Sequence, residues 1–185
     1  MFAMIQPKIR QPVPKKKIVF PDYKAHLIFW TLAVVGLSLD LWSKWAAFER
    51  LEEWETFPVI DGFMQFVTAL NDGAVWGSLS GKSYFLASVS ILAMVVIIVI
   101  FLFSGRQPRI FHVALGFLAA GIAGNLYDRI FNHGLVRDFI DVYYNNFHWP
   151  TFNVADIWLC VGAGLLLIST FIIETLDRKH ARQRR

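Results

Sequence analysis

Cysteine is almost absent from this chain. The single one, Cys160, excludes an intramolecular disulfide and any metal site built from several cysteines. It lies in an apolar segment among small residues, so we expect it to pack in the core. Neither His133 nor His148 has a carboxylate or a cysteine at zinc-ligand spacing, so the sequence predicts no metal and no cofactor. A Ser–His or Cys–His pairing and a glycine-rich phosphate loop are also missing, which disfavours the enzyme classes that depend on them.

Charge is scarce as well. Only 17% of the 185 residues are charged, 56% are hydrophobic, and the mean hydropathy is +0.47. A soluble domain of this length needs a more polar surface, so the composition predicts a membrane protein of one domain. The net charge of +4 does not indicate a nucleic-acid partner, because the basic residues cluster at the chain ends and in one short loop.

Four apolar segments are long enough to cross a bilayer, which takes about 20 residues in a helix. We expect spans at about 26–47, 83–103, 110–130 and 154–173. Prolines and like charges before the first span predict a mobile, uncleaved tail. The chain thus divides into a basic tail at 1–25, a membrane domain at 26–176 and a second basic tail at 177–185.

The connections between spans carry their own signals. Phe63–Leu70 partly alternates and is rich in β-formers, so a short strand is expected there, followed by a turn at Asn71-Asp72-Gly73. Aromatic residues near the loop ends are typical of an interfacial belt. The third span has a face of small residues that allows close helix packing. We expect that this face, including Gly121 and Gly124, could receive an apolar helix of a substrate.

The distribution of lysine and arginine predicts the orientation. Of the 18 basic residues, 13 lie in the two tails and in the turn at 104–109. By the positive-inside rule, both termini and that turn are cytoplasmic, and the loops at 50–82 and 131–152 are outside.

With this topology, polar residues of distant segments reach one height at the outer membrane boundary. A buried charge is costly there unless it is paired, hydrated or used in chemistry. The sequence therefore predicts one polar site, formed by these residues: Asp40, Lys44, Asn71, Asn125, Asp128, Arg129, Asp138, Asn153 and Asp156.

Asp138 and Asp156 are the candidates for catalysis. Two carboxyl groups that share a proton can act together as general base and general acid. Asp141 is a rival to Asp138, and spacing does not choose between them. Each acid also has a simpler interpretation, because Asp156 could only cap a helix and Asp138 could only be a solvated loop residue.

The remaining polar residues are interpreted as support. Asp40 and Lys44 are four residues apart on one helix face and can pair. Arg129 can bind a carboxylate through two N–H groups, and Asn125 can orient a neighbour. These residues could equally form a structural network without a chemical role, and Asn71 could be only a turn residue.

Five blocks of this sequence, in order, resemble the signature of bacterial lipoprotein signal peptidase (signal peptidase II): Asp40-Leu-Trp-Ser-Lys44, Asn71-Asp-Gly-Ala-Val-Trp76, Gly121-Ile-Ala-Gly-Asn125-Leu-Tyr-Asp128-Arg129, Val136-Arg-Asp138-Phe-Ile and Phe152-Asn153-Val-Ala-Asp156. Each block alone is weak, but five in order on this topology are specific. The long N-terminal tail and the bulky Val75-Trp76 depart from the family pattern.

The resemblance implies an all-α membrane protein with four transmembrane helices and a small extracytoplasmic β-cradle. It implies an aspartic endopeptidase of the bacterial inner membrane that acts at the periplasmic face, as a monomer among membrane lipids. Its substrate would be a prolipoprotein, cut before a cysteine that carries diacylglyceryl. Asp138 and Asp156 match the catalytic dyad of the family. The supporting or substrate-binding positions are Asp40, Lys44, Asn71, Gly121, Asn125, Asp128, Arg129 and Asn153.

Two other classes of function remain open from the residues alone. Intramembrane acids also serve as proton relays in transporters, although the inner halves of these spans lack the polar groups that a relay needs. A non-catalytic scaffold would use the same polar residues only for structure.

Overall fold

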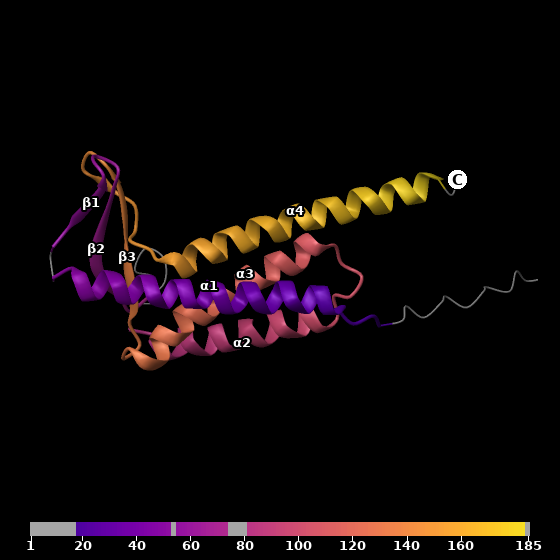
Figure 1. Cartoon of the computed structure of the whole chain (residues 1–185), viewed down its shortest axis with the longest axis horizontal. Coiled ribbons are helices and arrows are strands. Elements are labelled where there is room, and N and C mark those ends of the chain that lie inside the picture. Colours follow the sequence, from indigo (N-terminus) through magenta and orange to yellow (C-terminus); the bar gives the residue numbers. More distant parts are fainter. Residues whose placement is uncertain (1–17, 53–54, 74–80, 184–185) are drawn as a thin grey trace, which may run out of the picture.

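Four long helices form the body of the protein in a computed structural model of the chain (Figure 1). The structure describes residues 18–52, 55–73 and 81–183, with side chains as far as Thr175. The helices are α1 (Tyr23–Arg50), α2 (Ser83–Leu102), α3 (Arg109–Phe131) and α4 (Val154–Gln183). Each contains a stretch long and apolar enough to cross a membrane. The four predicted spans are therefore confirmed.

The ends of the helices follow from local sequence. α1 begins after Asp22, whose side chain accepts a hydrogen bond from the Ala25 amide at 2.9 Å and so caps the helix. Pro108 precedes α3, where its fixed φ suits a helix start. α4 runs well beyond the predicted span, because the basic segment after Ile173 continues the helix instead of forming a separate tail.

α3 is the central helix and packs against the three others. Half of the residues in the most apolar segment of α3 are buried, compared with 22% or less in the corresponding segments of the other three helices. Its small residues allow this, because their lack of side-chain bulk lets neighbouring backbones approach.

The small-residue face of α3 is already occupied by the protein itself. A Cβ atom on Gly121 would lie 2.5 Å from the Ala155 carbonyl oxygen of α4, and one on Gly124 would collide with Asp40 of α1. The expectation that this face receives a substrate helix is therefore wrong. Its close packing inside the bundle leaves no room for a second helix.

The hydrophobic core lies in the half of the bundle away from the sheet, between α1, α2 and α3. Phe29 of α1 stacks on Phe101 of α2 with ring centroids 4.1 Å apart, and Leu115 of α3 is fully buried beside them. Cys160 does not join this or any other core, because its side chain is exposed on α4. The prediction that it packs inside was wrong, because Cys160 lies on the outward side of α4, whereas Gly162 nearby packs against Leu118 of α3.

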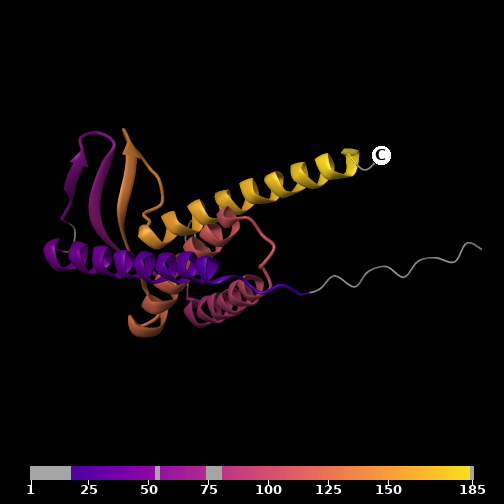
Figure 2. The ribbon, with the colours of Figure 1, turned by 45° about the vertical axis from the view of Figure 1, so that its right-hand side comes forward.

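A four-stranded antiparallel sheet stands across one end of the bundle (Figure 2). Its strands are β1 (Phe57–Ile60), β2 (Met64–Asn71), β3 (Val136–Tyr144) and β4 (Phe147–His148), in that order. The strand expected at Phe63–Leu70 is confirmed by β2. The sequence did not predict β3, which lies inside the supposed outer loop 131–152. Its charged residues indicated a solvated loop, but in the structure they are buried by contacts with residues from elsewhere in the chain.

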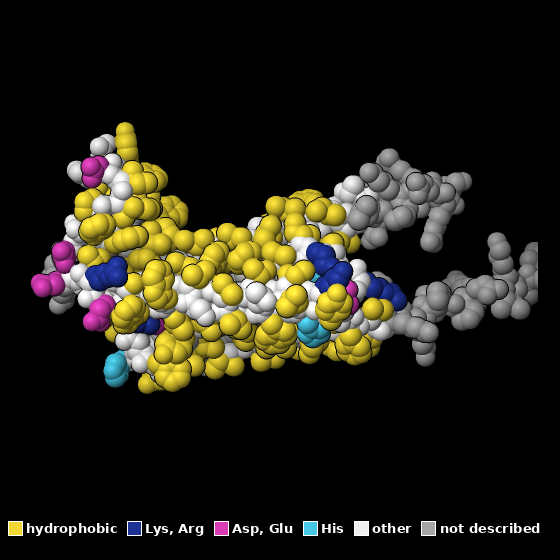
Figure 3. Space-filling view, in the orientation of Figure 1, with side chains coloured by type: hydrophobic (Ala, Val, Ile, Leu, Met, Phe, Trp, Pro, Cys, Tyr) yellow, Lys and Arg dark blue, Asp and Glu magenta, His cyan; other side chains and the backbone are white. Residues whose placement is uncertain are grey.

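The sheet and the two ends of the described chain lie at opposite ends of the bundle. The described chain begins at Ile18 beside the turn between α2 and α3, where the Gly105 amide donates to the Val19 carbonyl at 3.0 Å. The far end of α4 lies at this same end (Figure 1). On the face drawn in Figure 3, apolar side chains cover the length of the bundle, and most of the acidic side chains in view lie at the sheet end. Val75 and Trp76, where the sequence departs from the family pattern, lie outside the described residues.

Candidate active site

Five elements bring polar side chains together where the bundle meets the sheet. α1 contributes two charged residues, β2 one amide, α3 an amide and an acid, β3 one acid, and the start of α4 an amide and an acid. In that order they are Asp40 and Lys44, Asn71, Asn125 and Asp128, Asp138, and Asn153 and Asp156. Eight of the ten residues expected at the site thus form one hydrogen-bonded network.

Asp138 lies near the start of β3 and is only 3% exposed. Its Oδ1 accepts a hydrogen bond from the Asn153 side-chain amide at 2.6 Å, and its Oδ2 accepts one from Asn71 at 2.9 Å. Burial raises the pKa of Asp138 to about 6, and the nearby charge of Asp156 adds to the rise, while the two amide donors and Lys44 oppose it. A carboxyl group with this pKa exists in both protonation states near neutral pH.

Asp156 lies in the first turn of α4 and is less buried than Asp138. One oxygen accepts from Asn125 Nδ2 at 2.8 Å, and the other accepts from the Asn153 backbone amide at 3.1 Å. The Asp156 amide in turn donates to Asn153 Oδ1 at 3.1 Å, so the two residues cap the helix reciprocally.

Asn153 joins the two acids. Its side chain donates to Asp138 while its backbone amide donates to Asp156. The two carboxyl groups, far apart in sequence, therefore flank one fully buried asparagine side chain. They also interact electrostatically, as the effect of Asp156 on the pKa of Asp138 indicates.

A buried lysine supports this pair from the α1 side. The Nζ of Lys44, which is fully buried, lies 2.8 Å from Asp40 and 3.2 Å from Asp128, and it donates to Asn125 Oδ1 at 3.1 Å. Because Asn125 Oδ1 accepts from Lys44, its amide nitrogen is turned toward Asp156. Asp40 also accepts from the Ala155 backbone amide at 2.8 Å, which ties α1 to the start of α4.

The two arginines of this region have different roles from those predicted. Arg129 donates to the backbone carbonyls of Asn125 at 3.3 Å and Gly73 at 3.2 Å, and it makes no ion pair within the described residues. Arg137 instead holds a carboxylate, donating from Nε at 3.1 Å and from Nη2 at 2.7 Å to Asp128 Oδ1. No role was predicted for Arg137 from the sequence, because the strand that directs its side chain toward Asp128 was not predicted either.

The geometry also separates Asp138 from its rival. Asp141 is three residues further along β3, so its side chain lies on the opposite side of the strand. It accepts from Gln65 Nε2 at 2.7 Å and lies 2.8 Å from His148 Nδ1. These partners belong to β2 and β4, so Asp141 ties the sheet together and does not face Asp156.

Gly121 lies apart from the network, in the contact between α3 and α4. Its role is to let these helices approach, so that the start of α4 reaches Asn125. In the part of the chain that the structure describes, no three His, Cys, Asp or Glu side chains are arranged to hold a metal ion.

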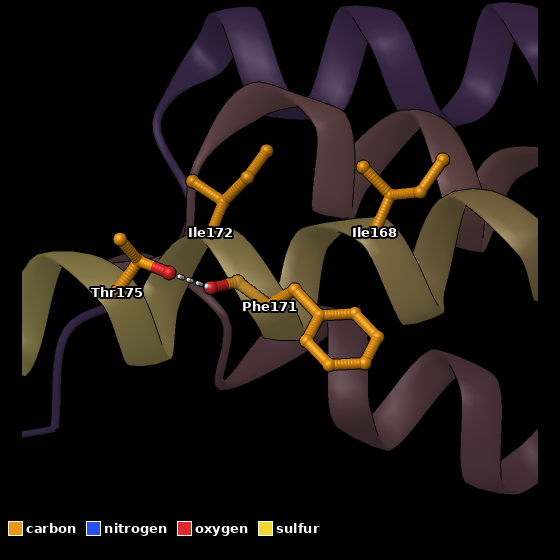
Figure 4. Close-up of a pocket in the computed structure, with 4 residues that line it drawn as sticks. All are labelled: Ile168, Phe171, Ile172 and Thr175. Atoms are coloured by element: carbon orange, nitrogen blue, oxygen red, sulfur yellow. Dashed lines mark hydrogen bonds between the residues drawn. The ribbon is translucent and has the colours of Figure 1, made fainter.

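A hollow on α4 lies apart from these residues (Figure 4). It measures about 330 Å³ and is lined by Ile168, Phe171, Ile172 and Thr175 at the other end of α4. Its one hydroxyl, on Thr175, already donates to the Phe171 carbonyl at 2.8 Å. This apolar hollow offers no group for acid–base chemistry.

Comparison with known proteins gives a consistent result. The profile of the family described as Signal peptidase (SPase) II matches residues 32–172. A lipoprotein signal peptidase of Bacillus pumilus is 33% identical over 157 residues, covering 85% of this chain and 98% of its own. One of Yersinia pestis is 39% identical over 145 residues, covering 76% and 85%. A solved bacterial membrane enzyme structure, obtained by the in meso method, superposes with a TM-score of 0.71 at 30% identity, covering 83% of this chain and 92% of that one.

Proposed function

Because this chain belongs to the signal peptidase II family, a group of peptidases that cleave signal peptides from prolipoproteins, we propose that it is an aspartic endopeptidase whose catalytic pair is Asp138 and Asp156. The substrate is a prolipoprotein that carries diacylglyceryl on a cysteine. Cleavage occurs at the peptide bond before that cysteine and requires no cofactor.

The observation that carries this proposal is the arrangement of the two acids around Asn153. Asp138 is held in a buried environment that favours its protonated form, and Asp156, in the first turn of α4, is less buried. Two neighbouring carboxyl groups in different surroundings can take the separate roles of acid and base.

The proposed reaction begins with water. Asp156 removes a proton from a water molecule, and the oxygen of that water attacks the scissile carbonyl carbon. Asp138 donates its proton to the carbonyl oxygen. The tetrahedral intermediate then loses its C–N bond, and the leaving nitrogen takes the proton from Asp156. The carbonyl re-forms and returns a proton to Asp138. Each acid ends in its starting state.

The place of the site in the fold supports this choice of substrate. The two acids lie at one end of four apolar helices, where a lipid-modified peptide is within reach from the bilayer surface. The chain ends and the basic residues near the α2–α3 turn lie at the opposite end. The positive-inside rule then puts the sheet and the acids at the periplasmic face of the inner membrane, with both termini in the cytoplasm.

All residues of the network come from one chain, so we propose that a monomer is sufficient for catalysis. A proton relay across the membrane is disfavoured, since the hydrogen-bonded network is confined to the sheet end.

The test is cleavage of a diacylglyceryl-modified prolipoprotein by the purified protein in detergent. Asp138→Asn and Asp156→Asn should each abolish cleavage, and both should retain the helix content and monodispersity of the wild type. Asp141→Asn is the matched control, because it alters an acid on the same strand that faces away from Asp156. Cleavage at the wild-type rate by either dyad variant would refute the assignment.

A further inference from the structure

Arg137 is a residue of the polar network that neither the motifs nor the proposed reaction account for. It directly precedes Asp138 on β3, and its side chain is 20% exposed where it meets the fully buried Asp128 of α3. The contact includes the backbone as well, because the Arg137 amide donates to Asp128 Oδ2 at 3.0 Å. One carboxylate therefore receives three N–H groups from one residue.

The strand is held from both sides at this point. Successive side chains of a strand point to opposite faces, so Arg137 reaches α3 while Asp138 reaches Asn153 of α4 and Asn71 of β2. A guanidinium that binds a carboxylate through two nitrogens fixes both direction and distance. Loss of this contact would allow the backbone of β3 to shift at Arg137, the residue next to Asp138.

The charges of the buried cluster depend on the same residue. Asp40 and Asp128 are two fully buried acids that share one ammonium, that of Lys44. Arg137 supplies the second positive charge and brings the sum of these four residues to zero. A buried charge without compensation is strongly unfavourable, so Asp128 needs this partner if Lys44 is to serve Asp40 and Asn125 as well.

We propose that Arg137 is a positioning residue for Asp138: through its grip on Asp128 it fixes β3 against α3 and so sets where the Asp138 carboxyl stands relative to Asp156. This inference rests on the proposed function of the two acids. Arg137 itself need not touch the substrate. A displacement of about 1 Å at a catalytic group can lower a rate about a hundredfold, which sets the scale of the expected effect.

Removal of the positive charge should also move the pH dependence. Three charged groups near Asp138 come from the helices: Asp156 of α4, Lys44 of α1 and Arg129 of α3. The sheet contributes Arg137, Asp141 and His148, which is the partner of Asp141. Asn71 of β2 is neutral. Loss of one cation leaves an excess negative charge beside the pair. The Asp138 carboxyl group then holds its proton more strongly, and the pH–rate profile shifts to higher pH.

The experiment compares Arg137→Gln and Arg137→Lys with the wild type, using the same lipid-modified substrate in detergent. For Arg137→Gln we expect kcat to fall about tenfold to a hundredfold with KM nearly unchanged, and the pH–rate profile to move to higher pH. Arg137→Lys keeps the charge and loses the two-nitrogen geometry. It should retain the wild-type pH profile and show an intermediate kcat, which also keeps the test valid if the glutamine variant does not fold.

Arg109→Gln is the matched control, since Arg109 makes an equally two-pronged contact with Asp22 at the other end of the bundle. Its kcat should equal that of the wild type. Wild-type kcat in Arg137→Lys, or a kcat loss in Arg137→Gln that disappears when activity is expressed per folded molecule, would overturn the inference. Asp156→Asn separates the two proposals. If this variant is inactive, the proposed function stands even when the inference about Arg137 is overturned. If it is fully active, the proposed function itself is refuted.

Discussion

Two Asp–Arg pairs at opposite ends of this protein have the same chemistry and different surroundings. At the end away from the sheet, Arg109 donates to both oxygens of Asp22 at 2.7 and 2.5 Å, and both side chains are about half exposed, at 48% and 54%. At the sheet end, Arg137 holds Asp128 at 2.7 and 3.1 Å, and the acid is fully buried.

Burial determines what each pair can contribute. Water solvates the Asp22–Arg109 pair before and after it forms, so such a pair adds little to stability. Its Arg109 hydrogen bonds hold the pKa of Asp22 well below the usual range, and Asp22 also caps α1. The pair therefore fixes the entry of α1 beside the start of α3.

The Asp128–Arg137 pair belongs to a cluster that has lost its water. Desolvation of such groups commonly costs more than their attraction returns, so stability alone does not explain why they are present. The proposed positioning role of Arg137 accounts for their presence, because it requires a fixed arrangement of charges beside Asp138 and Asp156. An exposed Asp–Arg pair ties two segments together, whereas the buried pair fixes charges in a place without water.

The largest effect on folding is expected from the centre of the buried cluster. Lys44→Met leaves Asp40 and Asp128 without their shared cation and Asn125 without a donor. We expect a loss of about 3–5 kcal/mol in the free energy of unfolding, enough to prevent isolation of a folded protein. Thermal unfolding in detergent measures this loss. A folded, stable Lys44→Met protein would show that Asp40 and Asp128 do not depend on the charge of Lys44.

A second test uses the raised pKa of Asp138. Its pKa in the folded protein, about 6, exceeds the ordinary value of 3.8, so the unfolded chain releases this proton more readily. The contribution of Asp138 to stability is full below pH 4 and is lost as the pH rises through 6. Asp138→Asn removes this loss, so its stability relative to the wild type should improve by roughly 3 kcal/mol between pH 4 and pH 8.

The measurement is the melting temperature of both proteins across that pH range. Asp141→Asn serves as the control on the same strand, because it leaves Asp138 and its two amide donors in place. A constant difference between Asp138→Asn and the wild type at every pH would contradict the raised pKa.

A third test concerns the packing that brings the acids together. A Cβ on Gly124 meets the Asp40 carboxylate and Ala155, so Gly124→Ala should push α1 and α4 away from α3. We expect a loss of about 1–3 kcal/mol and reduced cleavage. Gly164→Ala is the control, because no atom lies within 4 Å of the added methyl and alanine favours a helix by up to about 1 kcal/mol. Equal stability of the two variants would contradict the close packing at Gly124.

The smallest effect is expected at the exposed pair. Arg109→Gln should lower the melting temperature only slightly, and this change should shrink in high salt because the pair is exposed to solvent. Melting temperatures in low and high salt measure it. A loss as large as that of Lys44→Met would remove the distinction between the two ends.

The sequence analysis was most successful where the signal is carried by neighbouring residues. The four spans depend on the local run of apolar residues, and the helices confirm each of them. The strand at β2 was visible in alternation between residues 63 and 70. The lysine of the first span was correctly paired with Asp40, since an i, i+4 contact follows from helix geometry alone.

The errors came from contacts between distant segments. β3 was hidden because its acids are buried by Asn71, Asn153, Gln65 and His148, none of which is a neighbour in sequence. The carboxylate contact expected of Arg129 is made by Arg137, for which no role was predicted, because strand geometry turns Arg137 toward Asp128. The small face of α3 was assigned to a substrate, while its own helices fill it.

By itself, the sequence determined that this is a four-span membrane protein and which polar residues lie near one boundary, because hydropathy and helix periodicity act over a few residues. Only the tertiary structure decided which acid faces Asp156, which arginine holds Asp128 and which glycines serve packing. Those choices depend on the register of β3 against β2 and on how closely α1 and α4 approach α3, and both result from contacts between residues remote in the chain.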